Sequence, residues 1–166
     1  MVADPAGLLA VARSLLTATP PSEAHFRRAV STAYCAVFHA TLRSGAERLM
    51  GPGTQRSAGY GLLYRGCNHG RMKTVCEALD VPVLGRRLQE QLGRTAVSPA
   101  MRDVAQAFPI LQEARHKADY DPSVVFVLSD AIDLVDLAAA TIQAFDQVAP
   151  EEKADMLALM LVSPRP

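Results

Sequence analysis

Two long apolar series separated by a short turn limit the folds open to this chain. Ser98-Pro99 and Asp121-Pro122 each offer a capping side chain followed by a proline, a pairing that favours the start of a helix. After each pair, apolar residues recur every three or four positions, which predicts an amphipathic helix. Helices joined by so short a turn must run antiparallel. The first series is Met101, Val104, Phe108, Leu111, Arg115 and Ala118, and the second is Val124, Leu128, Ala131, Val135, Ala138, Ile142 and Phe145.

Helix signals also cover most of the remaining chain, whereas strand signals are nearly absent. The sequence therefore predicts an all-α, up-down helical bundle of four to five main helices. It forms a single domain over residues 1–162, followed by a tail at 163–166. The predicted helices run from Pro5 to about Ala18, from Ser22 to about Met50, from Asn68 to about Leu79, from Leu84 to Leu92, from Ser98-Pro99 to Asp121, from Val124 to about Val148, and from Pro150 onward.

Residues 51–66 interrupt the helical pattern. They contain five of the ten glycines in the chain, together with Pro52. Glycine and proline favour turns and weaken helices, so this stretch is predicted to be a mobile, glycine-rich loop.

Several classes of protein are excluded by simple patterns. No apolar run approaches the ~20 residues that a membrane span needs, and the N-terminus has the pattern of no signal peptide, so we expect a cytoplasmic protein without a membrane partner. The odd number of cysteines (three) predicts reduced thiols. Cys67, His69 and Cys76 do not have the spacing of a zinc site, and neither a phosphate-binding loop nor a serine nucleophile motif is present. We expect no metal and no cofactor.

The net charge of zero conceals an asymmetry along the chain. Residues 13–102 contain 13 Lys or Arg against 5 Asp or Glu, whereas residues 103–166 contain 4 against 11. This division permits a basic face that would attract an anionic partner. Alternatively, the two halves neutralise each other when the helices pack.

Arg115 is the main exception to the apolar pattern, because it occupies a position where the series expects a buried side chain. An unpaired buried charge costs several kcal/mol, so Arg115 needs acceptors. Asp119 lies one helical turn later, within pairing distance. The pair is therefore either an internal staple of the bundle or part of a site that lines a groove. Tyr120 is expected to pack at the corner between the two helices, and Asp121 to cap the second one.

Two histidines complete the set of candidate residues. His39 follows the apolar run of the second helix, where a histidine is more often packed or exposed than catalytic. His69 follows the glycine-rich stretch, and residues on loops that a rigid scaffold holds often carry function.

Two segments of the chain carry motifs that are typical of one known family. The first is residues 27–40, Arg-Arg-Ala-Val-Ser-Thr-Ala-Tyr-Cys-Ala-Val-Phe-His-Ala, and the second is residues 115–121, Arg-His-Lys-Ala-Asp-Tyr-Asp. Together they resemble HEPN domains (higher eukaryotes and prokaryotes nucleotide-binding). The first segment is similar to the second-helix signature of that family, and the second resembles the Arg-x-x-Ala-Asp-Tyr-Asp that ends the penultimate long helix in one branch. The resemblance implies a helical homodimer. Many relatives are ribonuclease toxins paired with a nucleotidyltransferase antitoxin, while others bind nucleotides or act as non-catalytic partners.

The nuclease members carry an Arg followed, after four to six residues, by a His. Here positions 120–122 are Tyr, Asp and Pro, and His116 directly follows Arg115, about 100° around the helix. A metal-independent ribonuclease needs a cation for the phosphate and a base for the 2′-hydroxyl. Arg115 could supply the cation, with Asp119 as the tentative catalytic partner. The remaining candidates for the base are Tyr120, His69 and His39.

Three hypotheses follow for the function. The favoured one is a HEPN-like protein that binds RNA or a nucleotide, in a toxin–antitoxin or defence system. The alternatives are an active endoribonuclease with a variant centre and a non-catalytic helical interaction module. The predicted ligand-binding residues are Arg115, Asp119, Tyr120, Asp121, His69, His39 and Tyr34.

Overall fold

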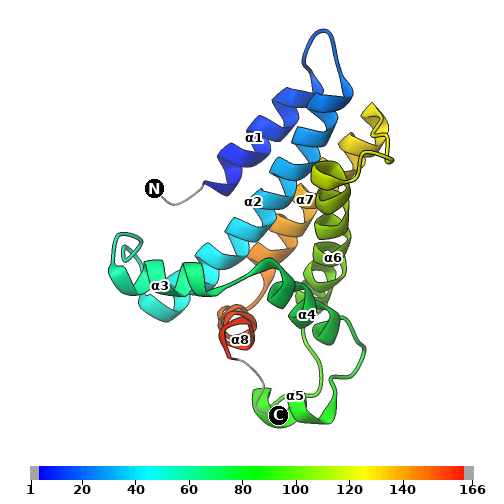
Figure 1. Cartoon of the computed structure of the whole chain (residues 1–166). Helices are drawn as coiled ribbons and strands as arrows, with labels where there is room; N and C mark the ends of the chain where they lie inside the picture. The colour runs from blue at the N-terminus through cyan, green and yellow to red at the C-terminus, as the bar shows by residue number, and fades with distance from the viewer. Residues whose placement is uncertain (1–3, 163–166) are drawn as a thin grey trace. The chain divides into compact units, whose positions relative to one another are not determined.

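The computed structural model describes residues 4–162, and every regular element among them is an α-helix (Figure 1). The predicted all-α fold is therefore confirmed. The described residues form eight helices, more than the four to five main helices expected, and the predicted tail at 163–166 lies outside them. The helices are α1 (Pro5–Leu16), α2 (Glu23–Met50), α3 (Ala58–Gly66), α4 (His69–Leu79), α5 (Arg86–Leu92), α6 (Pro99–Tyr120), α7 (Leu128–Gln147) and α8 (Pro150–Leu161).

The chain divides into two compact units, each built from two stretches of sequence. The first unit comprises Met1–Ala40 and Ala107–Gln143, and the second comprises Thr41–Gln106 and Ala144–Pro166. Helices α2, α6 and α7 each contribute residues to both units. The first unit therefore contains α1 with parts of these three helices, and the second contains their remaining parts with α3, α4, α5 and α8.

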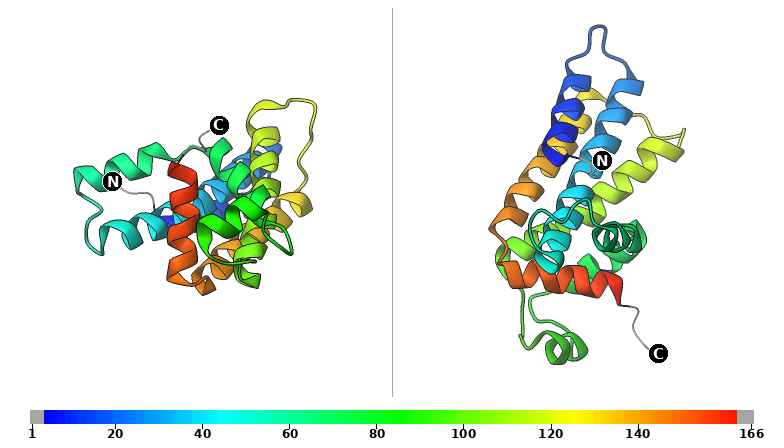
Figure 2. Two further views of the ribbon diagram at one scale, coloured as in Figure 1. Left: turned by 90° about the horizontal axis from the view of Figure 1, so that it is seen from below. Right: turned by 90° about the vertical axis from the view of Figure 1, so that its left-hand side faces the viewer.

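The first unit is a four-helix arrangement in which successive helices alternate in direction (Figures 1 and 2). The antiparallel course of α6 and α7 agrees with the two apolar series. Tyr34 of α2 and Phe108 of α6 are fully buried, and their ring centroids lie 5.4 Å apart. A further apolar cluster closes the core of this unit, and it consists of Val30, Ala118, Phe126 and Ala131.

The second unit has a core of its own. Its largest fully buried side chains include Leu42, Tyr60, Met72, Leu79, Met101 and Met156. Glu152 of α8 is also buried, and its carboxylate accepts hydrogen bonds from the backbone N–H and the hydroxyl of Ser98 at 2.9 and 2.5 Å. Arg94 Nη1 pairs with the same carboxylate at 3.1 Å, so the buried charge is compensated.

The prediction of a loop over the whole of 51–66 is wrong, because α3 occupies Ala58–Gly66. The hydroxyl of Ser57 caps this helix by accepting from the N–H of Tyr60 at 3.1 Å, and Tyr60 is buried. Burial of one aromatic side chain in a well-capped helix outweighs the low helix propensity of its glycines. The non-helical stretch is limited to residues 51–57, where Gly51 and Gly53 adopt the left-handed backbone region at φ +89° and +78°.

The start predicted for α7 is also wrong. Asp121 does not cap α7, which begins at Leu128; its carboxylate instead accepts hydrogen bonds from the N–H and hydroxyl of Ser123, at 2.9 and 2.6 Å. Such a local turn competes with helix formation. The chain then runs through a non-helical segment that inserts Phe126 into the core of the first unit before α7 starts.

Two further expectations, the capping side chains and the free cysteines, agree with the structure. Asp4, Asn68 and Ser98 each accept a hydrogen bond from a backbone N–H in the first turn of the helix that follows. Cys35, Cys67 and Cys76 are free thiols. Within residues 4–162, no helix has both the length and the apolar character to cross a membrane, and no cluster of His, Cys, Asp or Glu is arranged to hold a metal ion.

One close helix contact in the second unit is directly testable. A methyl group added at Gly45 of α2 would lie 2.9 Å from Cβ of Leu157 in α8. Overpacking of this kind costs about 1–3 kcal/mol, which opposes the gain of about 1 kcal/mol in helix propensity. We therefore expect Gly45→Ala to lower the free energy of unfolding, measured by urea denaturation, by about 1 kcal/mol.

Gly70→Ala is the matched control, because the nearest atom to its added methyl, Asn68 Oδ1, is 3.6 Å away. That variant should unfold at the same urea concentration as the parent chain, or at a higher one. Equal destabilisation by the two substitutions would contradict the proposed contact between α2 and α8.

Candidate functional site

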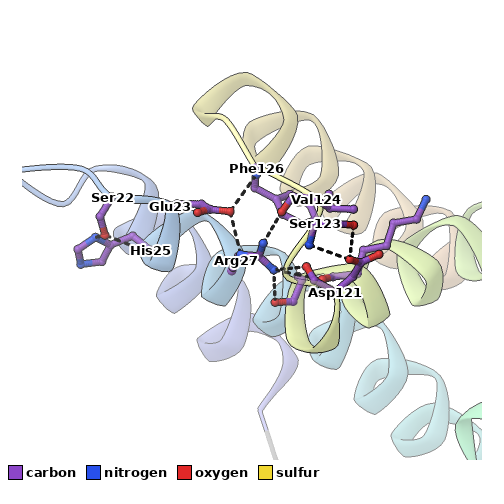
Figure 3. Close-up of polar contacts among 10 residues, drawn as sticks. Ser22, Glu23, His25, Arg27, Asp121, Ser123, Val124 and Phe126 are labelled. Atoms are coloured by element: carbon purple, nitrogen blue, oxygen red, sulfur yellow. Dashed lines mark hydrogen bonds and ion pairs between the residues drawn. The ribbon is translucent and has the colours of Figure 1, made fainter.

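A single arginine on α2 binds the carboxyl end of α6 (Figure 3). Nη1 of Arg27 donates hydrogen bonds to the carbonyl groups of Lys117, Ala118 and Asp121, at 3.2, 3.1 and 3.1 Å, and Nη2 donates to the carbonyl of Val124. The last carbonyls of a helix have no partners within the helix, and the helix dipole places negative charge there. Arg27 thus supplies both the missing donors and a complementary charge.

Arg27 is itself held from two sides. Its Nε pairs with Glu23 Oε1 at 2.9 Å, and the same carboxylate oxygen accepts from the N–H of Phe126 at 3.4 Å (Figure 3). The Phe126 ring lies 5.5 Å from Cζ of Arg27, a distance at which the ring face attracts a cation. These contacts hold the end of α6 and the following non-helical segment against the start of α2.

The last turn of α6 presents Asp119, around which three polar side chains gather. Nε of Arg115 lies 2.7 Å from Asp119 Oδ2, and the hydroxyl of Ser31 donates to the same oxygen at 3.2 Å. Nη1 of Arg28 lies 3.9 Å from Oδ1. We call Arg28, Ser31, Arg115 and Asp119 the Asp119 cluster. Two guanidinium groups share one carboxylate there, so the cluster carries a formal excess of one positive charge.

The charges of the Asp119 cluster are unequally accessible to solvent. The side chain of Asp119 is 16% exposed, that of Arg115 is 27% exposed, and that of Arg28 is 68% exposed. The carboxylate is therefore the inner group and the guanidinium groups are the outer ones. An approaching anion meets the positive charges first.

Tyr120 extends the cluster with an exposed aromatic ring. Tyr120 is 63% exposed, and Cζ of Arg115 lies 5.3 Å from the centroid of its ring. The ring of His116 lies 5.2 Å from the Tyr120 ring on the same helix. Tyr120 thus contacts both residues, although Arg115 and His116 project in different directions from α6.

Cys35, which belongs to α2, lies near the charged groups of the Asp119 cluster. Burial raises the pKa of its thiol, and the nearby carboxylate of Asp119 also raises it, while Arg115 and Arg28 act in the opposite direction. Burial is the largest of these effects. The sulfur of Cys35 therefore stays protonated at neutral pH and is a poor nucleophile.

The structure brings together three of the predicted site residues, which are Arg115, Asp119 and Tyr120. Tyr34 does not join them at the surface, because it is 0% exposed and packs between Phe38 and Phe108 in the core of the first unit. Asp121 follows the cluster and is partly exposed, and its hydrogen bonds with Ser123 hold the pKa of its carboxyl below the usual value.

The two histidines predicted to bind a ligand lie elsewhere. His39 is partly buried on α2, with its ring 5.7 Å from that of Phe38, and burial lowers its pKa, so the imidazole is neutral at pH 7. His69 begins α4 and belongs to the second unit.

Sequence reasoning did not identify Arg28 and Ser31 as members of the site. Their spacing contained a signal, because Arg28, Ser31 and Cys35 recur at three and four positions and so share one face of α2. Which of the two adjacent arginines, Arg27 or Arg28, faces solvent depends on the packing of α2 against α6. The helical period alone does not decide it.

Substitutions of the two adjacent arginines should differ in their effect on the free energy of unfolding. Arg27→Ala removes the donors for several carbonyls and leaves Glu23 without its cation, so we expect it to lower the free energy of unfolding by about 2–3 kcal/mol. Arg28→Ala removes only a loose, exposed ion pair and should change it by less than about 0.5 kcal/mol. Urea denaturation followed by circular dichroism measures both. Similar losses for the two variants would refute the assigned role of Arg27.

Comparisons with protein-family models, with curated proteins and with solved structures find no match to this chain. The resemblance to HEPN domains therefore stays a prediction that rests on the two motifs. The case for a function depends on the geometry of the Asp119 cluster and of Tyr120.

Proposed function

We propose that the chain binds RNA or a nucleotide through the Asp119 cluster and Tyr120. The observation that carries this proposal is the pair of partly exposed guanidinium groups that share one carboxylate beside an exposed aromatic ring. Phosphate needs a cation with several donors, and a base needs a flat apolar surface. Both features occur here within the last two turns of α6 and the facing part of α2.

Arginine suits the phosphate part of this recognition. Its planar guanidinium group donates to two phosphate oxygens at once and keeps its charge at any physiological pH. Asp119, which also accepts a hydrogen bond from Ser31, holds Arg115 from one side, and this reduces the conformational entropy that binding would otherwise cost. Arg28 is the more exposed cation and can turn toward an incoming phosphate.

Tyr120 suits an unpaired base. A base within a duplex already stacks on its neighbours, whereas single-stranded RNA offers free faces that stack on aromatic side chains. The Tyr120 ring has Arg115 and His116 as neighbours, so a base stacked on it would lie beside a positive charge for its phosphate. Single-stranded RNA or a mononucleotide is therefore the ligand class that fits.

The resemblance to HEPN domains adds two proposals about partners. One is a homodimer of this chain, and the other is a nucleotidyltransferase antitoxin encoded beside it. Both support a role in a toxin–antitoxin or defence system. The mass of the protein in solution by analytical ultracentrifugation tests the first, and inspection of the neighbouring genes tests the second.

Binding can be measured by fluorescence anisotropy with a short labelled single-stranded RNA. Arg28→Ala and Arg115→Ala should each weaken binding, and each should reduce the dependence of log affinity on log salt concentration by about one unit, because each removes a phosphate contact. Tyr120→Ala should cost about 1–3 kcal/mol through lost stacking, whereas Tyr120→Phe should bind almost as the parent chain does. An unlabelled mononucleotide as competitor shows whether one nucleotide is sufficient.

Arg86→Ala is the charge-matched control. Arg86 forms an exposed ion pair with Glu90 on α5, which lies in the second unit. Its loss changes the net charge by the same amount but leaves the Asp119 cluster intact. If Arg86→Ala weakens RNA binding as much as Arg28→Ala, the binding is nonspecific and the proposed site is wrong.

One observation favours a second candidate function, an endoribonuclease with a variant centre. The His116 ring and the Arg115 guanidinium both lie near the Tyr120 ring, so a histidine and an arginine are close to one exposed residue. Histidine is the commonest general base, and arginine can stabilise the charge on the phosphate.

The cleavage hypothesis has its own test. Incubation of single-stranded RNA with the protein in the presence of EDTA should yield products that end in a 2′,3′-cyclic phosphate, and His116→Gln and Arg115→Ala should each slow the reaction at least about a hundredfold. His25→Gln is the control, because His25 is hydrogen-bonded to Ser22 at the start of α2 and is not part of the proposed centre. Cleavage that persists in both variants would exclude this centre.

A further inference from the structure

The two oxygens of the Asp119 carboxylate have different surroundings. Oδ2 has two partners, because Nε of Arg115 lies 2.7 Å from it and the hydroxyl of Ser31 donates to it at 3.2 Å. Oδ1 accepts no hydrogen bond from residues 4–162, and Nη1 of Arg28 lies 3.9 Å from it. Oδ1 therefore has lone pairs available for a donor on a ligand.

Oδ1 is also open to such a ligand. The Asp119 side chain is 16% exposed, and Oδ1 is not one of the fully buried polar atoms that lack a partner within the described residues. Arg28, the cation beside it, is 68% exposed. A long, exposed side chain that holds an ion pair at this distance loses little when the contact breaks. A ligand can therefore reach Oδ1 while the pair between Asp119 and Arg115 stays intact.

The chemistry of a carboxylate limits what the donor is. An ionised carboxylate only accepts hydrogen bonds, and the phosphate groups of a nucleotide present acceptor oxygens with the same sign of charge. Phosphate therefore binds the guanidinium groups of Arg28 and Arg115, and Oδ1 needs an N–H or O–H group. A nucleotide offers two kinds, which are the hydroxyl groups of the sugar and the N–H groups of the base.

The order of the side chains in the site decides between these two donors. Cζ of Arg115 lies 5.3 Å from the centroid of the Tyr120 ring, and Nε of the same arginine lies 2.7 Å from Asp119. Arg28 approaches Asp119 at the other carboxylate oxygen. The sugar of a nucleotide likewise joins the base to the phosphate. A base on Tyr120 and a phosphate on Arg28 therefore place the sugar beside Asp119, whereas the N–H groups of the base point away from the sugar.

We propose that Oδ1 of Asp119 accepts a hydrogen bond from the 2′-hydroxyl of the bound nucleotide, and that Asp119 thereby selects ribose over deoxyribose. This inference rests on the proposed function, because it concerns the same site. The 2′-hydroxyl is the group by which a protein distinguishes the two sugars, and it keeps its proton in this contact. Deoxyribose has no donor at this position, so it leaves Oδ1 unpaired beside the bound phosphate and loses affinity.

Four labelled oligouridines of equal length separate the donor from the other properties of ribose, and fluorescence anisotropy with the full chain measures their affinities. One carries ribose, one deoxyribose, one 2′-O-methylribose and one 2′-fluororibose. The methyl ether keeps the oxygen but has no proton, and the fluoro sugar keeps the pucker of ribose without a donor. We expect the ribose oligomer to bind at least about tenfold more tightly than each of the others, because they lack a hydrogen bond to a charged group.

The outcomes separate this inference from the function on which it rests. Affinities of all four oligomers within about twofold of one another would overturn the role of Asp119 and leave the proposed binding site in place. Binding of none of the four would contradict the proposed function and this inference with it.

Substitution of Asp119 tests the assignment to one residue. Asp119→Ala removes the acceptor, so the preference for ribose over deoxyribose should fall to within about twofold, whatever the change in overall affinity. Asp119→Asn keeps the size of the side chain beside Arg115, and its neutral oxygen accepts a weaker hydrogen bond, so the preference should fall at least about threefold. Circular dichroism shows which variants are folded, and the full preference of the parent chain in a folded variant would overturn the proposal.

Asp133→Ala is the matched control. Asp133 is an exposed residue of α7 in the first unit and is not a member of the Asp119 cluster. Its loss changes the net charge by the same amount, so the preference for ribose should stay within about twofold of that of the parent chain. An equal loss of preference in Asp133→Ala and Asp119→Ala would mean that the charge of the unit sets the preference, and would overturn the proposal.

Discussion

The hydrogen bonds from Arg27 to the carboxyl end of α6 are the interaction on which the candidate site depends. A helix that ends against the body of a protein needs donors for its last carbonyls, and the segment after α6 supplies one of them, from the N–H of Asp121 to the carbonyl of Lys117 at 3.1 Å. Arg27 meets this need with one guanidinium group, and Glu23 and Phe126 fix the position of that group. The orientation of the last turn of α6, and therefore of Asp119 and Tyr120, follows from these contacts.

The adjacent residues Arg27 and Arg28 of α2 thus have different roles. Arg27 turns toward α6 and is neutralised by a carboxylate and by carbonyl groups, whereas Arg28 stays largely in solvent. The charge that remains available to a ligand comes from Arg28 and Arg115, which share Asp119. A partly buried carboxylate that two arginines share keeps both cations close together while leaving an excess of positive charge. This arrangement accounts for the presence of Asp119 in the site that we propose for an anion.

Much of the fold was predictable from local signals. The absence of strand patterns, the apolar series of α6 and the capping residues Asp4, Asn68 and Ser98 are properties of short stretches, and they gave the correct fold class and most helix boundaries. The failures have a common cause, which is competition between local propensity and packing. The helix α3 forms because Tyr60 is buried, and α7 starts late because Phe126 enters the core and Asp121 turns back to Ser123. Neither event is visible in the spacing of residues.

The candidate site was predictable only in part for the same reason. Arg115, Asp119 and Tyr120 are close in sequence, so the helical period placed them together. Arg28 and Ser31 come from a different helix, and their contribution depends on how α2 packs on α6. Tyr34 belonged to the same sequence motif, yet packing placed it in the core of the first unit.

The most direct test of the central claim is the NMR signal of each arginine Nε–H group during titration with a short single-stranded RNA. Our account predicts that the signals of Arg28 and Arg115 shift progressively as RNA is added, while that of Arg27 stays in place because its hydrogen bonds to α6 persist. A shift confined to arginines of the second unit, or a loss of the Arg27 signal on binding, would contradict it.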